Sequence, residues 1–346
     1  MFYKSHIYPV DSIEGRPQAH ASTLTQIADK DNNIRIKTAW FCGTKEGAKD
    51  VAILSSTISY PRKIYTSGEP APVIYSKPEV IADHPDKALG NPVLFRMTDG
   101  VLHFWYAVLS NEHGKPEQIM HKRSLDDGKT WTEPEEFAPR EGIWPRNLPI
   151  VLHSGRILLP LNDELTYNEK YKTDWSSGFA YSDDDGKTWH HTDYIFAKKG
   201  CIQPAIAQRS DGSIYCVMRG RKGHLWESVS TDDGETWKEP EKVKIQNPNS
   251  NAALIKSGLN EFLLINNPSK KNRKFLRIYR SPDEGKTWKP WIDLEPSQFH
   301  DKPPKKYKEF SYPCIIGTND SVLHITYTYG RKTIEHAAFG PGFSEI

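Results

Sequence analysis

The sequence predicts an all-β protein, a six-bladed β-propeller of four-stranded antiparallel blades whose ring is closed by the N-terminal strand. Two independent repeats predict this fold: a turn motif that occurs four times and an apolar run that occurs six times. The 25 prolines and 23 glycines suit a loop-rich β fold and oppose a helical one. Because a propeller is one closed unit, we expect a single domain over residues 1–346.

The turn motif reads Ser-x-Asp-x-Gly-x-Thr-Trp. It begins at Ser124, Ser182, Ser230 and Ser281, which are 58, 48 and 51 residues apart. Its Asp can accept backbone N–H groups of its own turn, and its Gly can adopt a positive φ. Thr and Trp then start a strand, with the indole packed under the turn. Repeats at this spacing indicate stacked or radial units, and several short strands per unit favour a propeller over a helical solenoid.

The apolar runs have a small or polar entry, often with a proline, and each predicts the innermost strand of one blade. They are Ala19–Leu24, Gly90–Phe95, Arg146–Val151, Ile202–Ile206, Asn249–Leu254 and Ser311–Ile316. The four turn motifs then fall between the third and fourth strands of blades two to five. Blade one has Asp50–Ile58 as its third strand. Blade six has Val322–Tyr329 and Thr333–Phe339 but no fourth strand, so Phe2–Tyr8 is expected to supply it and to remove two sheet edges.

Composition argues against several classes of protein. The chain carries 46 basic and 44 acidic residues, and no block of like charge indicates binding of nucleic acid. No stretch of about 18 apolar residues predicts a membrane span. The N-terminus lacks the basic segment and long apolar run of a secretory signal, so a cytoplasmic location is expected. The four cysteines lack metal-ligand spacing and are expected in the core. The sequence predicts no metal and no cofactor, and it leaves the oligomeric state open.

Polar residues gather where the predicted inner strands begin and where the second strands end, and in a propeller these segments converge on one end of the axis. They are His20, Arg146, Gln203, Asn249 and Tyr312 at the inner strands, and Glu46, Glu164, Arg219, Arg273 and Arg331 beyond the second strands. Such groups are costly unless they are paired or functional. Converging arginines repel one another unless an anion or several carboxylates lie between them. The asparagines Asn91, Asn147 and Asn251 are expected instead to bond to neighbouring inner-strand backbone.

The turn motif is the Asp-box, and over nearly its full length the chain resembles the sialidase superfamily. It is most similar to a bacterial sialidase-like group with His-Ala-Ser-Thr, Gly-Asn-Pro and Asn-Pro-Asn-Ser signatures. The resemblance implies three arginines that hold the substrate carboxylate, a Tyr nucleophile assisted by a Glu, and an Asp acid/base. It implies that Arg219 and Arg273 are the second and third arginines and that Tyr312 is the nucleophile. Glu46 is the nearest carboxylate in the segment that carries the acid/base.

The sequence departs from the family pattern in two places. His20-Ala21-Ser22 stands where the family has Arg-Ile-Pro on the inner strand of blade one. Gln203 replaces the Glu that assists the tyrosine, and a Gln cannot accept a proton.

Three functions fit these residues. The first is an exo-acting glycoside hydrolase on a terminal acidic sugar, a sialic or other ulosonic acid. In this enzyme Arg219 and Arg273 clamp the carboxylate, Tyr312 attacks or stabilises the anomeric centre, and Glu46 protonates the leaving oxygen. The second is a uronate-directed polysaccharide lyase, in which His20 or Tyr312 removes the C5 proton while an arginine neutralises the carboxylate together with the Gln203 amide. For both enzymes the expected partner is an acidic carbohydrate.

The third function is that of a non-catalytic carbohydrate-binding propeller. Its sugar-stacking faces would come from Trp40, Trp144, Trp175 and Trp226, of which half or more are expected in the core. The products distinguish the three, since a hydrolase yields a reducing sugar, a lyase yields an ultraviolet-absorbing unsaturated uronate, and a binding module yields neither.

Overall fold

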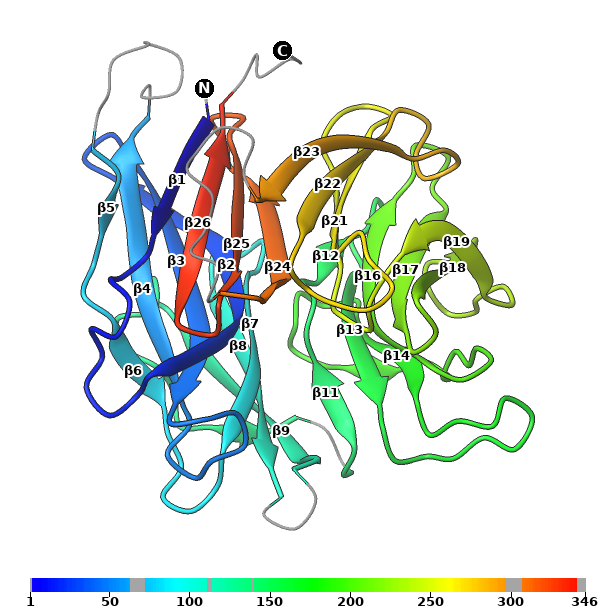
Figure 1. The fold of residues 1–346 in the computed structure, drawn as a ribbon, viewed down its shortest axis with the longest axis horizontal. Coiled ribbons are helices and arrows are strands. Elements are labelled where there is room, and N and C mark those ends of the chain that lie inside the picture. Colours follow the sequence, from blue (N-terminus) through cyan, green and yellow to red (C-terminus); the bar gives the residue numbers. More distant parts are fainter. Residues whose placement is uncertain (1, 63–71, 111–113, 138–139, 297–306, 341–346) are drawn as a thin grey trace. The chain divides into compact units, whose positions relative to one another are not determined.

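The computed structural model describes residues 2–62, 72–110, 114–137, 140–296 and 307–340. These residues form six antiparallel sheets, the blades of a six-bladed β-propeller, and contain no helix (Figure 1). Four sheets have four strands, and the other two have a short fifth strand beside a path of four. The predicted fold class is confirmed.

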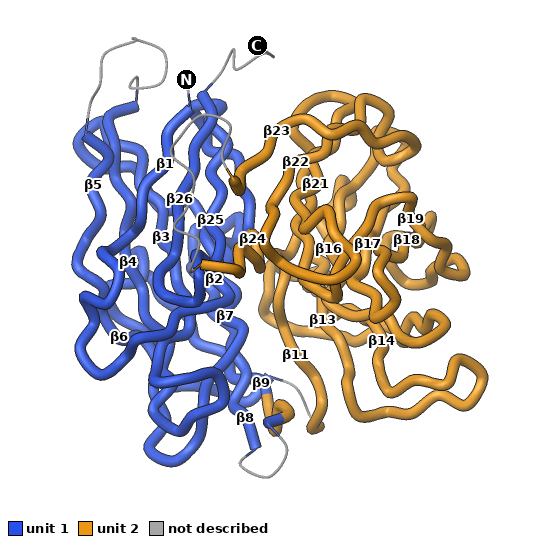
Figure 2. Tube along the Cα trace, in the orientation of Figure 1, with its two compact units in different colours: residues 1–114, 119–137, 314–346 blue, residues 115–118, 138–313 orange. Residues whose placement is uncertain are grey.

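The chain divides into two compact units, which are described separately (Figure 2). Unit 1 contains residues 1–114, 119–137 and 314–346, and unit 2 contains residues 115–118 and 138–313. Two strands, β9 and β24, begin in unit 2 and continue in unit 1.

Unit 1 holds blades one, two and six. Blade one consists of β2 (Gln18–Lys30), β3 (Asn33–Gly43), β4 (Ala52–Pro61) and β5 (Ile74–Tyr75), with β6 (Glu79–Ala82) also paired to β4. Blade two consists of β7 (Leu89–Arg96), β8 (Leu102–Leu109), β9 (Pro116–Ser124) and β10 (Glu135–Glu136). Blade six consists of β24 (Phe310–Gly317), β25 (Leu323–Tyr329), β26 (Thr333–Phe339) and β1 (Phe2–His6).

Unit 2 holds blades three, four and five. Blade three consists of β11 (Ile143–Pro145), β12 (Ile150–Val151), β13 (Ile157–Asp163), β14 (Ser176–Ser182) and β15 (His190–His191). Blade four consists of β16 (Cys201–Gln208), β17 (Ile214–Gly220), β18 (His224–Ser230) and β19 (Glu241–Gln246). Blade five consists of β20 (Ala253–Lys256), β21 (Phe262–Asn266), β22 (Leu276–Ser281) and β23 (Lys289–Glu295).

The N-terminal strand is the outer strand of blade six. β1 pairs antiparallel with β26, with Phe2 opposite Phe339 and His6 opposite Glu335. The strand ends at His6, before the predicted Tyr8, although Ile7 still donates its N–H to the Ile334 carbonyl at 2.9 Å. The prediction that the first residues supply the missing strand is confirmed, and one outer edge of the sheet is covered.

Two predicted inner strands differ from the structure. In blade three Arg146–Pro149 is not a strand, and the β11 and β12 segments on either side pair with β13. Pro145 and Pro149 lack the N–H that a strand ladder needs, which explains the interruption. In blade five the strand begins at Ala253, not at Asn249, because the Asn247 side chain accepts the Ser250 N–H at 2.9 Å and holds a turn there.

The Asp-boxes lie between the third and fourth strands of blades two to five, as predicted. In the box that follows β14, Ser182 Oγ accepts the Gly186 N–H at 2.8 Å, and Asp184 Oδ1 accepts the Thr188 N–H at 2.8 Å. Trp189 Nε1 donates to the Gly186 carbonyl at 3.0 Å, so the indole is tied to its own turn. Gly186 has φ 82°, the left-handed conformation that a glycine adopts without strain.

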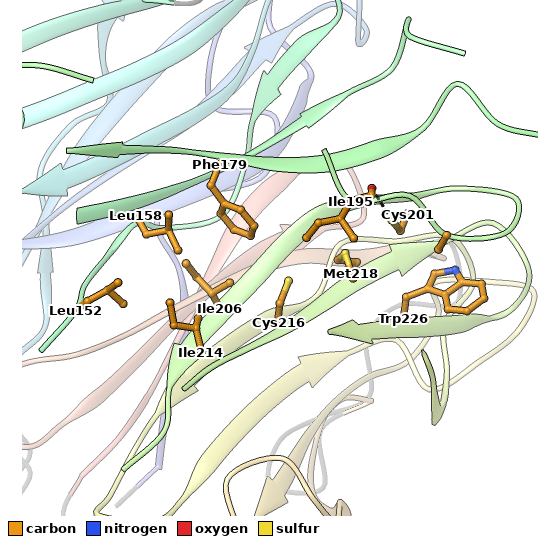
Figure 3. Close-up of a cluster of buried hydrophobic side chains, with 11 residues drawn as sticks. Leu152, Leu158, Phe179, Ile195, Cys201, Ile206, Ile214, Cys216, Met218 and Trp226 are labelled. Carbon is orange, nitrogen blue, oxygen red and sulfur yellow. Dashed lines mark hydrogen bonds between the residues drawn. The ribbon is translucent and has the colours of Figure 1, made fainter. Parts of the chain in front are cut away.

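The core between the blades of unit 2 fixes which way the side chains of β17 point. Ile214, Cys216 and Met218 belong to one buried cluster with Leu158 and Phe179 of blade three (Figure 3). The alternate residues of β17, Tyr215 and Val217, belong to a second cluster with Phe262 and Leu264 of blade five. Because strand side chains alternate with a period of two, Arg219 continues the side that faces blade five.

Candidate functional site

Unit 2 brings Tyr312, Arg219, Gln203 and Asn249 into one hydrogen-bonded group. Arg219 Nη1 donates to Tyr312 Oη at 2.7 Å and to Gln203 Oε1 at 3.1 Å. Arg219 Nε donates to Asn249 Oδ1 at 2.7 Å. Gln203 Nε2 in turn donates to Tyr312 Oη at 3.3 Å. Two residues of blade four therefore bond the phenolic oxygen of Tyr312 in β24, and Asn249, at the entry to blade five, bonds one of them.

Backbone irregularities aim two of these side chains. Gln203 has φ 55° and Tyr312 has φ 55°, a left-handed conformation that is uncommon for residues other than glycine. The pairing of β16 with β17 shifts register between Ile202 and Ala205, as expected for a β-bulge at Gln203. A bulge turns a side chain out of the alternation of its strand. The same conformation at Ala21 and Asn91 of unit 1 shows that the inner strands repeat this feature.

The donor-only guanidinium of Arg219 fixes the orientation of the Gln203 amide. Because Arg219 can only donate, Gln203 must present Oε1 to it, and Nε2 is left to face Tyr312. Tyr312 Oη therefore accepts two hydrogen bonds, one of them from a charged group. Charge-assisted bonds are about twice as strong as neutral ones, so this arrangement favours negative charge on the oxygen.

Arg273 reaches the same tyrosine from blade five. Its guanidinium carbon lies 5.4 Å from the centroid of the Tyr312 ring. Its Nη2 donates to the Asn249 carbonyl at 2.8 Å, and its Nη1 pairs with Glu309 Oε1 at 2.9 Å. Asn249 thus links both arginines, one through its side chain and the other through its carbonyl.

Arg146 lies behind Tyr312 and is nearly buried, with an exposed fraction of 2%. Its Nη2 donates to the Tyr312 carbonyl at 2.9 Å, and its guanidinium carbon lies 5.1 Å from the ring centroid. The expected contact between Arg146 and substrate stays a prediction, and in the structure its guanidinium lies against the backbone of Tyr312. A guanidinium buried against backbone carbonyls supports the tyrosine, and it adds a third cation within about 6 Å of the ring.

A second group of charges adjoins the first through Trp175. Arg221 and Arg219 lie 3.8 and 5.2 Å from the Trp175 ring centroid. Arg221 Nη2 pairs with Asp174 Oδ1 at 2.9 Å, and Lys115 Nζ lies 3.9 Å from Asp174 Oδ2. Trp175, proposed from sequence as a sugar-stacking face, therefore carries two guanidinium groups on its ring.

Glu164 belongs to this second group. Asn162 Nδ2 donates to Glu164 Oε1 at 3.2 Å, and Lys115 Nζ donates to the Glu164 carbonyl at 2.6 Å. Burial raises the pKa of the Glu164 carboxyl, although Arg219, Lys115 and Arg221 oppose that shift. A carboxyl group whose burial outweighs nearby cations is a candidate proton donor.

The remaining predicted residues belong to unit 1 and form separate contacts there. Glu46 pairs with Arg331 Nη1 at 2.5 Å and is more than half exposed. His20 is buried, and its Nδ1 lies 2.7 Å from Thr328 Oγ1. Their roles beside Tyr312 stay predictions from the family resemblance.

Asn147 and Asn251 bond to inner-strand backbone as predicted, Asn251 Nδ2 to the Pro313 carbonyl at 3.4 Å, whereas sequence reasoning missed other groups. Asn147 Nδ2 donates to the carbonyls of Gln203 and Pro204, each at 3.0 Å, and Asn251 Nδ2 bonds to Asn147 Oδ1 at 3.1 Å. Glu309 was missed, although its position three residues before Tyr312 could have indicated a partner for an arginine. Asp174 and Lys115 gave no signal, because charged residues in loops are most often solvated.

Among the described residues, no group of three or more His, Cys, Asp or Glu side chains could hold a metal ion. Within the same part of the chain, no helix is long and apolar enough to cross a membrane.

The sequence model of the BNR repeat-like domain matches residues 35–325. The chain belongs to this family. Its membership in the sialidase superfamily agrees with the Asp-boxes of blades two to five. This BNR propeller is 27% identical over 239 residues to a sialidase of Bacteroides fragilis (strain YCH46), an alignment that covers 64% of this chain and 41% of the relative. The chain thus spans less than half the length of that relative.

Two solved structures share the fold of this BNR propeller. One is the Hadza microbial sialidase Hz136, with a TM-score of 0.74 and 17% identity over 98% of this chain and 68% of the other. The second is a protein of unknown function from Dyadobacter fermentans DSM 18053, with a TM-score of 0.70 and 15% identity over 97% of each chain. At these identities the two solved structures show a shared fold.

Proposed function

We propose that this protein is an exo-acting glycoside hydrolase that removes a terminal acidic sugar, a sialic acid or related ulosonic acid, from a glycan. The observation that carries the proposal is the meeting of Arg219 and Arg273 at Tyr312. Two guanidinium groups that converge on one phenol suit a substrate with a carboxylate close to its reacting carbon. Ulosonic acids have this arrangement, because their carboxylate is attached to the anomeric carbon itself.

The two arginines retain donors for such a carboxylate. Within the described part of the chain, no hydrogen bond uses Nη2 of Arg219 or Nε of Arg273. The partners that they do have, Asn249 and Glu309, hold the guanidinium planes in place. A preorganised fork loses less entropy on binding than a flexible ammonium group, so arginine suits this task better than lysine.

Tyr312 attacks or stabilises the anomeric centre in this proposal. Its oxygen accepts bonds from Arg219 and Gln203, which orient it and favour negative charge on it. Gln203 cannot remove the phenolic proton, so its role is to position the phenolic oxygen and to accept a hydrogen bond from Arg219. His20 is buried, with 1% of its surface exposed, which disfavours it as the base of a lyase and leaves Tyr312 as the candidate for that role.

A glycan-release screen tests this proposal. Sialosides, other ulosonic acid glycosides and uronate polysaccharides are incubated with the protein, and the products are followed by reducing ends and by ultraviolet absorbance. The hydrolase releases a reducing acidic sugar with no new unsaturation. A rise in absorbance would support the lyase, and binding without any product would support a carbohydrate-binding module. The Arg219→Ala variant controls for contaminating enzymes, because it should lose the release.

A further inference from the structure

We propose that Glu164 is the proton donor to the leaving oxygen of the glycoside, an inference that rests on the hydrolase function proposed above. Glu164 follows β13 in blade three, whereas the family resemblance looks for the acid/base in blade one at Glu46. The proposal assigns a catalytic carboxyl to a different blade.

A series of contacts runs from the backbone carbonyl of Glu164 to the phenol of Tyr312. Lys115 bonds the Glu164 carbonyl and lies 3.9 Å from Asp174, which pairs with Arg221. Arg221 and Arg219 share the ring of Trp175, and Arg219 bonds Tyr312. Every residue in this series belongs to unit 2.

The backbone of Glu164 is held on both sides, which fixes where its side chain starts. The Glu164 N–H donates to the Gly142 carbonyl at 2.9 Å, and its carbonyl accepts from Lys115 at 2.6 Å. The carboxyl group itself accepts from Asn162, which is 1% exposed. Asn162 Oδ1 has no donor among the described residues. After a half-turn of the amide, that oxygen would face Glu164 and could accept a hydrogen bond from the carboxyl only in its protonated form.

The other carboxylates of this region are each paired with a cation. Asp163 pairs with Arg140 at 2.7 Å, Asp174 with Arg221 at 2.9 Å, and Glu309 with Arg273 at 2.9 Å. Glu164 makes no ion pair with any described residue, although Arg219, Arg221 and Lys115 act on it from a greater distance and Asp174 opposes them. Burial outweighs these cations and raises the pKa of the carboxyl, so Glu164 keeps its proton at a higher pH than an ordinary glutamate.

The step balances with water as the only co-reactant. As the bond between the anomeric carbon and the leaving oxygen breaks, its electron pair stays on the oxygen, which takes the proton of Glu164. The positive charge that develops at the anomeric carbon is stabilised by the sugar's own carboxylate and by Tyr312. Water then adds to that carbon and gives a proton to the Glu164 carboxylate, which restores the acid.

Substrates with different leaving groups test the assignment. A 4-nitrophenyl glycoside of the acidic sugar needs little protonation to depart, whereas a sugar alcohol as leaving group needs it fully. For Glu164→Gln, kcat/KM on the unactivated glycan should fall about 10²–10⁴-fold, and on the nitrophenyl glycoside by less than about 10-fold. The wild-type rate should fall at high pH as Glu164 loses its proton, and this fall should be absent in Glu164→Gln. Glu169→Gln, an exposed carboxylate of the same loop, is the matched control and should behave as wild type.

The outcomes separate this inference from the function on which it rests. The Glu164→Gln protein should first be shown to unfold at the wild-type temperature. If it then loses equal activity on both substrates, or loses none, the role of Glu164 is overturned and the hydrolase function is not. A loss that depends on the leaving group in Glu46→Gln but not in Glu164→Gln would assign the proton donor to Glu46. A wild-type protein that cleaves neither substrate would overturn the proposed function, and this inference with it.

Discussion

Arg219 Nη1 lies 2.7 Å from the phenolic oxygen of Tyr312, within hydrogen-bonding distance of a group 93 residues away in the chain. The same nitrogen bonds Gln203, and the same tyrosine ring lies 5.4 Å from the guanidinium carbon of Arg273. Arg219 is therefore shared between the residue that would react and the site that would bind the carboxylate. Changes at Arg219 should affect both binding and the chemical step.

Replacing Arg219 with lysine should damage the enzyme although it keeps the charge. The ammonium group cannot bond Asn249, Gln203 and Tyr312 at once, because the planar fork is lost. We expect kcat/KM for the acidic glycoside to fall about 10²–10³-fold, as on removal of one preorganised donor. Steady-state kinetics measure the loss. Arg280→Lys, on the exposed arginine that pairs with Glu261, should leave the rate unchanged, and an equally active Arg219→Lys would refute the role of the fork.

Replacing Gln203 with glutamate should supply the base that the site lacks. A carboxylate at this position would pair with Arg219 and could accept the phenolic proton of Tyr312. We expect kcat to rise about 10-fold or more near neutral pH, and a new decline on the acid side where the carboxylate is protonated. A pH–rate profile of both proteins provides the measurement. A variant slower than wild type at every pH would show that the amide, not a base, is what Tyr312 needs.

The tryptophans of the Asp-boxes should serve stability and not activity. Trp237 stacks on Phe179 of blade three with ring centroids 4.7 Å apart, and its Nε1 donates to the Gly234 carbonyl at 3.1 Å. Trp237→Ala should lower the free energy of unfolding by about 3–5 kcal/mol through lost packing. Urea denaturation measures this change, and kcat/KM of the folded fraction should stay at the wild-type value. A specific loss of activity in a fully folded variant would contradict a purely structural role.

Stability should fall on the acid side because unit 1 buries neutral histidines. His324 Nδ1 lies 2.9 Å from His336 Nε2, and His121 Nε2 lies 2.9 Å from His103 Nδ1. Burial lowers the pKa of His336 and of His121 to about 3, and it lowers the pKa of His324 well below 6.5. The unfolded chain binds these protons below about pH 6.5 and the folded chain does not, so stability decreases from about pH 6.5 toward pH 3.

Unfolding free energies between pH 8 and pH 5 test this expectation. Below the ordinary histidine pKa, each buried histidine should contribute a slope of up to about 1.4 kcal/mol per pH unit. His121→Gln should reduce the slope by up to one such contribution, whereas His153→Gln, at an exposed position, should leave it unchanged. A wild-type stability that is flat over this range would contradict the burial of neutral histidines.

The sequence predicted the blades well because two of their features repeat. The Asp-box needs specific residues at fixed spacing, and the inner strands need apolar runs, so both leave a local signal. Blade three shows where that signal fails. Arg146–Val151 has the composition of an inner strand, yet Pro145 and Pro149 remove donors from the ladder and the strand breaks around them.

The site was only partly predictable, since side-chain direction depends on distant partners. Arg146 and Arg219 look alike in sequence, but one guanidinium is buried against the Tyr312 carbonyl and the other bonds the Tyr312 oxygen. The left-handed backbone at Gln203 and Tyr312 also leaves no composition signal, because neither residue is a glycine. Glu164 is predictable as a site residue from its place after a second strand, whereas the burial that raises its pKa appears only in the folded chain.

Whether the arginines of unit 2 bind a carboxylate is tested most directly by comparing an acid with its methyl ester. Isothermal titration calorimetry can measure the binding of a non-hydrolysable analogue of the acidic sugar in both forms. We expect the acid to bind about 100-fold more tightly than the ester, because charge-assisted bonds from Arg219 and Arg273 are lost on esterification. In Arg219→Lys this preference should shrink. An ester that binds wild-type protein as tightly as the acid would contradict this role of the arginines.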